Sequence, residues 1–113
     1  MTARIVMKKK RHKYNAKRTE RNGRMFASKK EAKRYDELKI MEEVGLISKL
    51  VLQPSFILYI NGIVIGKYFA DFSYYDNEKK QEVIEDVKGV RTPLYKFKKR
   101  YCEAQYDITI TEI

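Results

Sequence analysis

The sequence contains one cysteine, one histidine and no tryptophan among its 113 residues. Cys102 therefore has no partner for a disulfide within the chain, which is typical of proteins of the reducing cytoplasm. With His12 as the only histidine, neither a zinc site built from His and Cys nor a Ser-His or Cys-His catalytic relay is expected. Any hydrolytic chemistry has to rest on carboxylates, lysines and a hard metal ion.

Long apolar runs are also lacking. None approaches the ~20 residues that a membrane-spanning helix requires, and no charged-then-apolar leader indicates export. The hydrophobic fraction of 43% is ordinary for a globular protein, so global disorder is not expected. A chain of 113 residues has room for one core only, and we expect a flexible basic arm over residues 1–13 followed by one domain over residues 14–113.

Positive charge is abundant and unevenly placed. The formal net charge is +10, and residues 1–24 hold ten of the 25 Lys and Arg residues but only one acid. This asymmetry indicates a polyanionic partner, most simply nucleic acid, and binding that weakens steeply with salt. A solubilising tail is the alternative, whereas a membrane-surface role is disfavoured because the arm has no amphipathic apolar face. The candidate DNA-binding residues here are Lys8, Lys9, Lys10, Arg11, Lys13, Lys17 and Arg18.

A hairpin and then a helix are predicted after the basic arm. Asn22-Gly23 is a favoured two-residue hairpin turn, because both residues tolerate positive φ. Ser28 and Glu31 fit the capping box that begins a helix. The helix is predicted to run from Ser28 to about Val44 and to end at Gly45, since glycine is the usual residue just past a helix C-terminus.

Glu31 lies on the face of this helix that is predicted to be buried. Helical spacing puts Tyr35, Leu38 and Met41 on an apolar stripe, and Glu31 falls in the same stripe one turn before Tyr35. The other glutamates of the helix are explained by solvent or by the edge of the stripe. Two interpretations of Glu31 remain open: it caps the helix only, or it also turns its carboxylate toward a site.

The middle of the chain is predicted to form a sheet. An apolar run at 50–53 is broken by Pro54 and continues at 56–60, and Asn61-Gly62 predicts a second hairpin turn before the apolar residues 63–65. Residues 68–75 predict a single strand rich in aromatic residues, with Tyr68, Ala70, Phe72 and Tyr74 on one face. Asp71 is a lone acid on the other face of that strand.

A strand predicted over residues 83–88 carries two acids and a lysine. Alternation places Asp86 and Lys88 on one face and Glu85 on the other. Burying such charges on a core strand is costly unless they have partners or a function, and holding a divalent metal against a phosphate is one such function. The acid-x-Lys pattern also occurs at 31–33, 37–39 and 78–80. The pattern alone therefore does not indicate a site, and the evidence for 86–88 is its position beside the strand of Asp71.

The last part of the chain predicts a helix and a strand. Thr92-Pro93 supplies an N-cap and a first helical residue, so a helix is predicted over about 93–104, and 108–111 alternates as a final strand. The predicted core stripe of the helix is Leu94, Phe97, Tyr101 and Ala104. The remaining cationic face includes Lys96 and Lys99 and either contacts DNA or is merely solvated.

The predicted order is therefore helix, three strands, helix, strand (α-β-β-β-α-β), an α/β arrangement with a mixed central sheet flanked by helices. With Glu31 on the first helix and Asp71 and Asp86-Val87-Lys88 on adjacent strands, it resembles the PD-(D/E)XK nuclease superfamily and its restriction-endonuclease-like core. The segments 28–32, 52–54, 70–72 and 85–89 resemble a small phage and prophage family proposed to include Holliday-junction-resolvase-like endonucleases. The resemblance covers about residues 13–113, and Ala70 stands where the superfamily pattern has proline.

This resemblance implies a metal-dependent DNA endonuclease that hydrolyses phosphodiester bonds in branched or structured DNA during recombination, with Mg²⁺ or Mn²⁺ as cofactor. It assigns catalysis to Glu31, Asp71, Asp86 and Lys88. The metal ligands would be the three acids and the backbone carbonyl of Val87, because oxygen ligands suit Mg²⁺. Lys88 would orient the attacking water or neutralise charge on the phosphate. Gln53, Thr92, Tyr95 and Lys99 would support the site or the DNA.

The same resemblance bears on location and partners. It implies a phage- or prophage-encoded protein in the cytoplasm of a bacterial host, with DNA as partner and no membrane. Because resolvases cut two strands symmetrically and usually work as dimers, a homodimer is an expectation, although no dimer surface can be read from the sequence.

Two other classes of function remain open. One is a non-catalytic nucleic-acid-binding protein on a nuclease-like fold, which the presence of all four candidate catalytic residues disfavours. The other is a basic structural protein in which Asp71 and Asp86 are merely hydrogen-bonded. In that case Asp86→Asn would change stability alone.

Overall fold

The computed structural model describes residues 18–113, which fall into a first unit that ends at Glu37 and a second unit, Leu38–Ile113. The predicted basic arm over residues 1–13 lies outside the described residues, and so do the DNA-binding candidates Lys8, Lys9, Lys10, Arg11, Lys13 and Lys17. Within the described part, no helix is long and apolar enough to cross a membrane.

The first unit contains the predicted N-terminal hairpin. Strands β1 (Thr19–Arg21) and β2 (Arg24–Phe26) pair antiparallel. The two turn residues have positive φ, 52° at Asn22 and 78° at Gly23, which confirms the turn that the Asn-Gly pair predicts. The Phe26 ring packs 4.9 Å, centroid to centroid, from the Tyr35 ring and so joins the hairpin to the helix that follows.

Helix α1 (Lys29–Glu43) begins in the first unit and ends in the second. The Ser28 hydroxyl accepts the backbone N–H of Glu31 at 3.1 Å, which confirms the predicted N-cap. At the other end Gly45 has φ +84°, its N–H bonds the carbonyl of Glu42, and Leu46 N–H bonds the carbonyl of Met41. This is the Schellman arrangement of a glycine-terminated helix, as predicted. On the predicted stripe, Tyr35 and Leu38 are buried and Met41 is half-buried.

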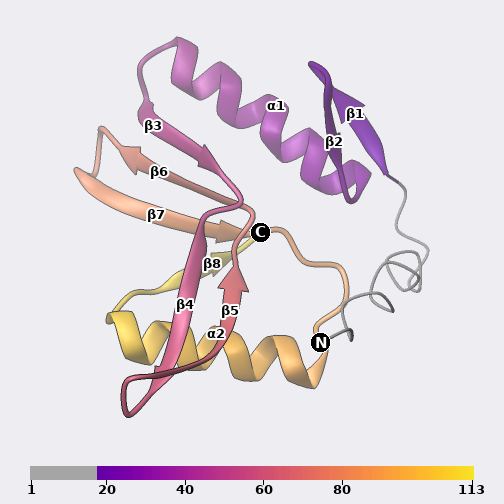
Figure 1. Ribbon diagram of the computed structural model, residues 1–113. Helices are drawn as coiled ribbons and strands as arrows, with labels where there is room; N and C mark the ends of the chain where they lie inside the picture. The colour runs from indigo at the N-terminus through magenta and orange to yellow at the C-terminus, as the bar shows by residue number, and fades with distance from the viewer. Residues whose placement is uncertain (1–17) are drawn as a thin grey trace. The chain divides into compact units, whose positions relative to one another are not determined.

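A mixed four-stranded sheet forms the centre of the second unit. Its order is β3-β6-β7-β8, with bounds β3 (Ile47–Leu52), β6 (Phe72–Asp76), β7 (Gln81–Asp86) and β8 (Ile110–Glu112). The first three strands pair antiparallel, and β8 pairs parallel with β7. Helix α2 (Pro93–Tyr106) makes the connection that a parallel pair requires. The protein is thus of the α/β class, with a mixed sheet and two helices (Figure 1).

Strands β4 (Ser55–Ile60) and β5 (Ile63–Phe69) form a separate two-stranded sheet that crosses α2 (Figure 1). The Asn61-Gly62 turn between them has positive φ at both residues, as predicted. A bulge between Leu58 and Tyr59 shifts the register of the pair. Five strands therefore follow α1 and precede α2 in the chain, where the predicted order had three. Three of these five belong to the central sheet.

The prediction of one continuous strand over residues 68–75 is wrong. The chain leaves β5 after Phe69 and enters β6 at Phe72, so Ala70 and Asp71 lie between two sheets. The opposing chain breaks at the same level, where Gln53 has φ +54° and is followed by Pro54. The predicted alternation survives the break: Tyr68, Ala70, Phe72 and Tyr74 are all buried.

The predicted core stripe of the second helix is wrong at three of its four residues, and only Tyr101 packs against the core. Leu94 is 63% and Phe97 61% exposed, and Ala104 is exposed as well. The face of α2 that packs inward carries Cys102, which is fully buried in a cluster with Leu58, Tyr68, Ala70, Ile84 and Ile110. Helical spacing identifies an apolar face but does not say whether another element covers it. Burial raises the pKa of the Cys102 thiol to about 11, so this cysteine is a packing residue.

Truncating Phe72 tests the position of the core. Phe72 is fully buried, so Phe72→Ala is expected to lower the free energy of unfolding by about 3–5 kcal/mol. Phe97→Ala is the matched control and is expected to cost less than about 1 kcal/mol because its ring is largely exposed. Urea unfolding followed by circular dichroism measures both, and equal losses would contradict the assignment of α2's outer face.

Candidate functional site

Asp86, the last residue of β7, is the most enclosed acid of the second unit, with no exposed surface. The Tyr68 hydroxyl donates to its Oδ2. Its Oδ1 lies 3.2 Å from Lys88 Nζ, an ion-pair distance, yet it accepts no hydrogen bond of good geometry from the described residues. A buried carboxylate oxygen whose close partner is an adjacent ammonium can still bind a further cation or hydrogen-bond donor.

The sheet fixes the backbone of Asp86 on both sides. Strand β7 lies between β6 and β8, and Asp86 is registered opposite Glu112 of β8. The N–H of Ile113 bonds the Asp86 carbonyl at 2.9 Å. The backbone from which the carboxylate projects is therefore held on both sides by the sheet.

Asp71 is tied to the same place by both its backbone and its side chain. Its N–H bonds the carbonyl of Glu85 at 3.0 Å, and its carbonyl accepts the N–H of Gln53 at 2.9 Å. Its Oδ2 accepts the N–H of Val87 at 2.7 Å. Asp71 thus holds Val87, the residue that follows Asp86. The junction between the two sheets is what brings Asp71 near Asp86.

Lys88 lies beyond the strand that was predicted to contain it. Strand β7 ends at Asp86, so the predicted strand end at 88 is two residues too long. Outside the ladder, the Lys88 side chain turns back to Asp86 and places Nζ 4.4 Å from the centroid of the Tyr95 ring. The ammonium is thus held between a carboxylate and an aromatic face, and only a quarter of the side chain is exposed.

Glu85 is as buried as Asp86 but has a different environment. Consecutive strand residues point to opposite faces, and the carboxylate of Glu85 accepts a hydrogen bond from the Tyr74 hydroxyl of β6. It is therefore a buried acid with a neutral donor on the other face of the sheet.

No role was predicted for Glu112, which lies beside the candidate site. The Tyr95 hydroxyl donates to its Oε2 at 2.7 Å, and Arg91 Nε donates to its Oε1 at 2.8 Å. Glu112 falls one residue after the predicted last strand, and only the parallel register with β7 places it opposite Asp86. Tyr68 was likewise predicted only as a core residue, because nothing in its spacing shows where its hydroxyl points.

Asp86 and Glu112, which are opposite one another in the β7–β8 register, have pKa values shifted in opposite directions. Burial raises the pKa of Asp86 above its ordinary value, and the Lys88 ammonium opposes that shift only in part. The hydrogen bonds from Tyr95 and Arg91 lower the pKa of Glu112. Glu112 is therefore stable as an anion, whereas Asp86 is a carboxylate that gains from any further positive charge beside it.

Glu31 lies in the first unit, where it is buried and its N–H is capped by Ser28. The structure brings together Asp71, Asp86, Val87 and Lys88 and places Glu31 within its own unit only. Over residues 18–113, no group of three or more His, Cys, Asp or Glu side chains is positioned to hold a metal ion.

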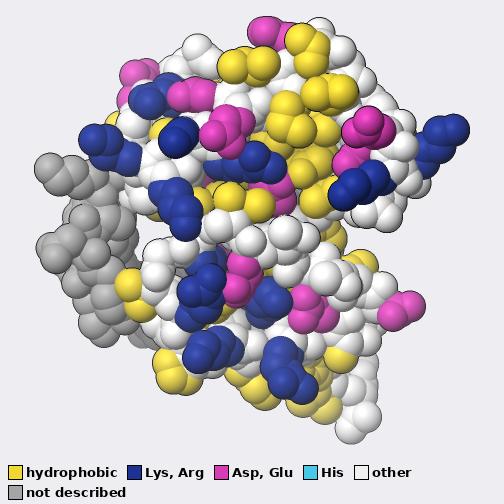
Figure 2. Space-filling model, turned by 180° about the vertical axis from the view of Figure 1, so that it is seen from behind, with side chains coloured by type: hydrophobic (Ala, Val, Ile, Leu, Met, Phe, Trp, Pro, Cys, Tyr) yellow, Lys and Arg dark blue, Asp and Glu magenta, His cyan; other side chains and the backbone are white. Residues whose placement is uncertain are grey.

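The described DNA-binding candidates differ in how available their charges are. Arg18 and Lys96 are exposed, whereas Lys99 Nζ lies 3.2 Å from Glu103 Oε2. Figure 2 shows Lys and Arg side chains spread over much of one face, with Asp and Glu side chains among them. A hollow of about 410 Å³ lined by β7 and the segment 107–111 includes neither Asp71 nor Asp86, so it is separate from the acidic site.

Comparisons with known proteins give one match. A protein-family model described as "Protein of unknown function (DUF1064)" matches residues 11–112. No curated protein and no solved structure matches the chain. The matched range includes every residue of the site described above.

Replacing Glu112 tests the network opposite Asp86. A carboxylate whose folded pKa is lowered stabilises the protein above its unfolded pKa, and that stabilisation is lost as the pH falls. Glu112→Gln is therefore expected to be less stable than the parent at pH 7, with a difference that shrinks below about pH 4. Unfolding free energies at pH 7 and pH 3 measure it. Glu82→Gln, an exposed acid on β7, is the control and should show no such pH dependence; a constant deficit for Glu112→Gln would contradict the network.

Proposed function

The chain belongs to the DUF1064 family, and from the residues of its own site we propose that it is a metal-dependent DNA endonuclease that hydrolyses phosphodiester bonds. The observation that carries the proposal is the fully buried Asp86 carboxylate. Its Oδ1 lacks a hydrogen bond among the described residues, lies beside Lys88, and is next in the chain to a residue held by Asp71.

The donor set suits a hard divalent cation. Mg²⁺ is commonly bound by one or two carboxylates, with water and substrate phosphate completing six oxygen ligands. Asp86 and Asp71 supply two carboxylates, and the Val87 carbonyl between Asp86 and Lys88 is the third candidate oxygen. Glu31 would join them directly or through water, as the sequence resemblance implies. A cation here would also offset the cost of burying Asp86.

Such an ion, when bound, polarises the scissile phosphate and lowers the pKa of a water molecule. The chain itself supplies the positioning. Tyr68 holds Oδ2 of Asp86 so that Oδ1 faces Lys88, and the Tyr95 ring keeps the Lys88 ammonium in place. From that position Lys88 can orient the attacking water or neutralise charge that grows on the phosphate.

The strand order supports the PD-(D/E)XK assignment within this proposal. Without the inserted β4–β5 hairpin, the sequence of elements is helix, three antiparallel strands, helix, and a strand parallel to the third. This is the α-β-β-β-α-β order with a mixed sheet that the superfamily resemblance implies. The candidate residues fall at the junction before β6 and at the end of β7, which correspond to the second and third strands of that core.

DNA is the proposed substrate because the net charge is +10 and phosphate contacts dominate nucleic-acid affinity. Branched or otherwise structured DNA follows from the resolvase-like resemblance. The second candidate function is a non-catalytic nucleic-acid-binding protein on the same fold. It is favoured by one observation, that no group of three or more His, Cys, Asp or Glu side chains among residues 18–113 is positioned to hold a metal ion.

A cleavage assay separates the two. In Mg²⁺ or Mn²⁺ the protein is expected to nick or cut structured DNA, Asp86→Asn to abolish cleavage, and Lys88→Ala to slow it by about 100-fold or more. DNA binding should survive in both variants, since neither side chain is needed for backbone contacts made elsewhere. Glu82→Gln and Lys79→Ala, which replace exposed charges, are the matched controls and should cleave normally.

A readout independent of cleavage accompanies this assay. Mg²⁺ is expected to raise the thermal midpoint of the parent protein but not that of Asp86→Asn, because a ligand stabilises only the state that binds it. Undiminished cleavage by Asp86→Asn would refute the nuclease proposal. So would the absence of cleavage by the parent on linear, flapped and four-way substrates.

The salt dependence of DNA binding tests the cationic surface of α2. Lys96→Ala is expected to lower the slope of log Kd against log salt by about 1, as for one lost phosphate contact. Lys99→Ala should have a smaller effect because its ammonium is already paired with Glu103. Fluorescence anisotropy from low to high salt measures the slopes, with Lys79→Ala on the β6–β7 turn as control. Equal slopes for the parent and Lys96→Ala would place the DNA elsewhere.

A further inference from the structure

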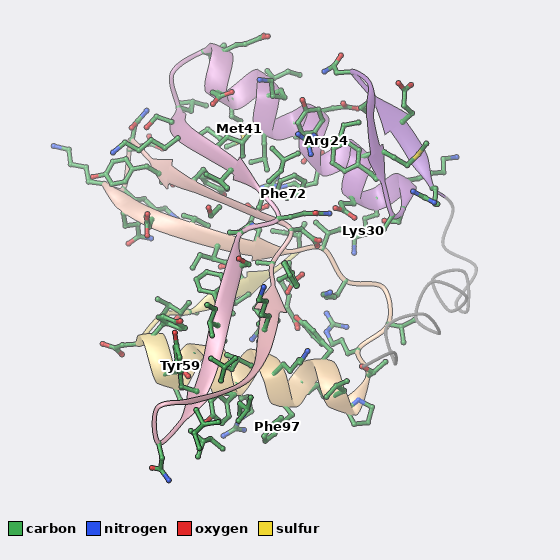
Figure 3. All side chains as sticks on the ribbon, viewed as in Figure 1. Arg24, Lys30, Met41, Tyr59, Phe72 and Phe97 are labelled. Carbon is green, nitrogen blue, oxygen red and sulfur yellow. The ribbon has the colours of Figure 1, made fainter. Side chains whose placement is uncertain are left out.

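The two outer edges of the β4–β5 hairpin differ in whether their backbone groups are hydrogen-bonded. On the β4 edge, side chains of α2 take up the outward backbone groups. Gln105 Oε1 accepts the N–H of Tyr59 at 2.9 Å, and the Tyr101 hydroxyl donates to the Tyr59 carbonyl. Gln105 Nε2 and the Tyr106 hydroxyl both donate to the carbonyl of Ile57, at 2.8 and 2.7 Å. This edge is closed, and Figure 3 shows Tyr59 where β4 crosses α2.

The β5 edge is open. Within the described part of the chain, β5 pairs with β4 alone, and no side chain bonds its outward backbone groups. The strand is seven residues long, and four of its apolar side chains are about half exposed or more: Ile63, Val64, Ile65 and Phe69. A long, apolar strand with an unpaired edge is a template for pairing with another strand.

We propose that β5 pairs antiparallel with β5 of a second copy of this chain, so that two hairpins join into one four-stranded sheet of order β4-β5-β5-β4. Antiparallel self-pairing is isologous, so each copy offers the other the surface that it needs. The proposal concerns assembly only and stands whether or not the site cleaves DNA.

Charge and register favour a second copy over other partners. Lys67 is the only charged residue of β5, and an apolar edge with one ammonium is a poor surface for a polyanion. In β4–β5, Val64 is opposite Tyr59 and Lys67 is opposite Ile57, the two β4 residues whose backbone groups face α2. The backbone groups of Val64 and Lys67 therefore face the open side. A two-fold pairing of Val64 with the partner's Lys67 is mutual and keeps the two lysines apart.

The surface is large enough for a reversible dimer. The exposed apolar side chains of β5 amount to on the order of 450 Å². A stable complex buries ~800 Å² on each partner, so this surface is at the lower end of the range. We therefore expect a dimer whose dissociation depends on concentration in the micromolar range.

Sedimentation equilibrium of the full chain, without DNA or metal, tests the proposal. The parent is expected to dimerise at ~100 μM or below. Val64→Lys, which sets a lysine opposite the partner's Lys67, should raise the dimer Kd by at least about tenfold. Phe97→Lys is the matched control because Phe97 is as exposed as Val64 but lies on α2, and it should leave the Kd unchanged.

Two results would overturn the proposal. One is a parent protein that stays monomeric at every concentration measured. The other is a dimer that Phe97→Lys dissociates and Val64→Lys does not, which would move the interface to the exposed face of α2. Circular dichroism of both variants checks that the fold is kept. If Val64→Lys does not fold, Ile65→Lys replaces it, since Ile65 is the unpaired bulge residue of the same edge and the same rise in Kd is expected.

Discussion

The carboxylate of Asp86, buried without exposed surface at the end of β7, is the constraint on which the polar structure of the second unit depends. Burying a charged group is costly, so its surroundings have to compensate. Tyr68 reaches it from the hairpin and Lys88 from the following loop. Lys88 is then steadied by the Tyr95 ring, whose hydroxyl is held by Glu112. One enclosed charge thus determines the orientation of side chains from three different elements.

Features that depend on a few neighbouring residues could be predicted from the sequence. Two Asn-Gly turns, the Ser28 and Thr92 caps and the Gly45 helix end all formed as expected, because each is decided by local φ/ψ and hydrogen bonding. The position of Asp71 and Asp86 near one another also followed from strand alternation and connectivity. For the turns and caps the physical cause lies within a few residues of the effect.

Features that depend on distant parts of the chain could not be predicted. Pro54 was recognised as a break in one strand, but the matching break at Asp71 follows only from the pairing of the two chains. The apolar spacing of Leu94 and Phe97 was real, yet nothing covers that face within residues 18–113. Glu112 could be placed opposite Asp86 only from the parallel register. Tertiary packing decides all three.

The span of the site's own hydrogen bonds has a consequence for how the protein folds. Tyr68 is 18 residues from Asp86, Asp71 is 16 from Val87, and Tyr95 is 17 from Glu112. Each of these hydrogen bonds closes a loop of chain. The conformational entropy lost in closing that loop has to be offset before the bond adds stability. Turns and helices can therefore form early, whereas the acidic centre comes together only when β7 has paired on both sides. Its formation therefore depends on the pairing of β6 and β8 with β7, whereas that of the turns and helices does not.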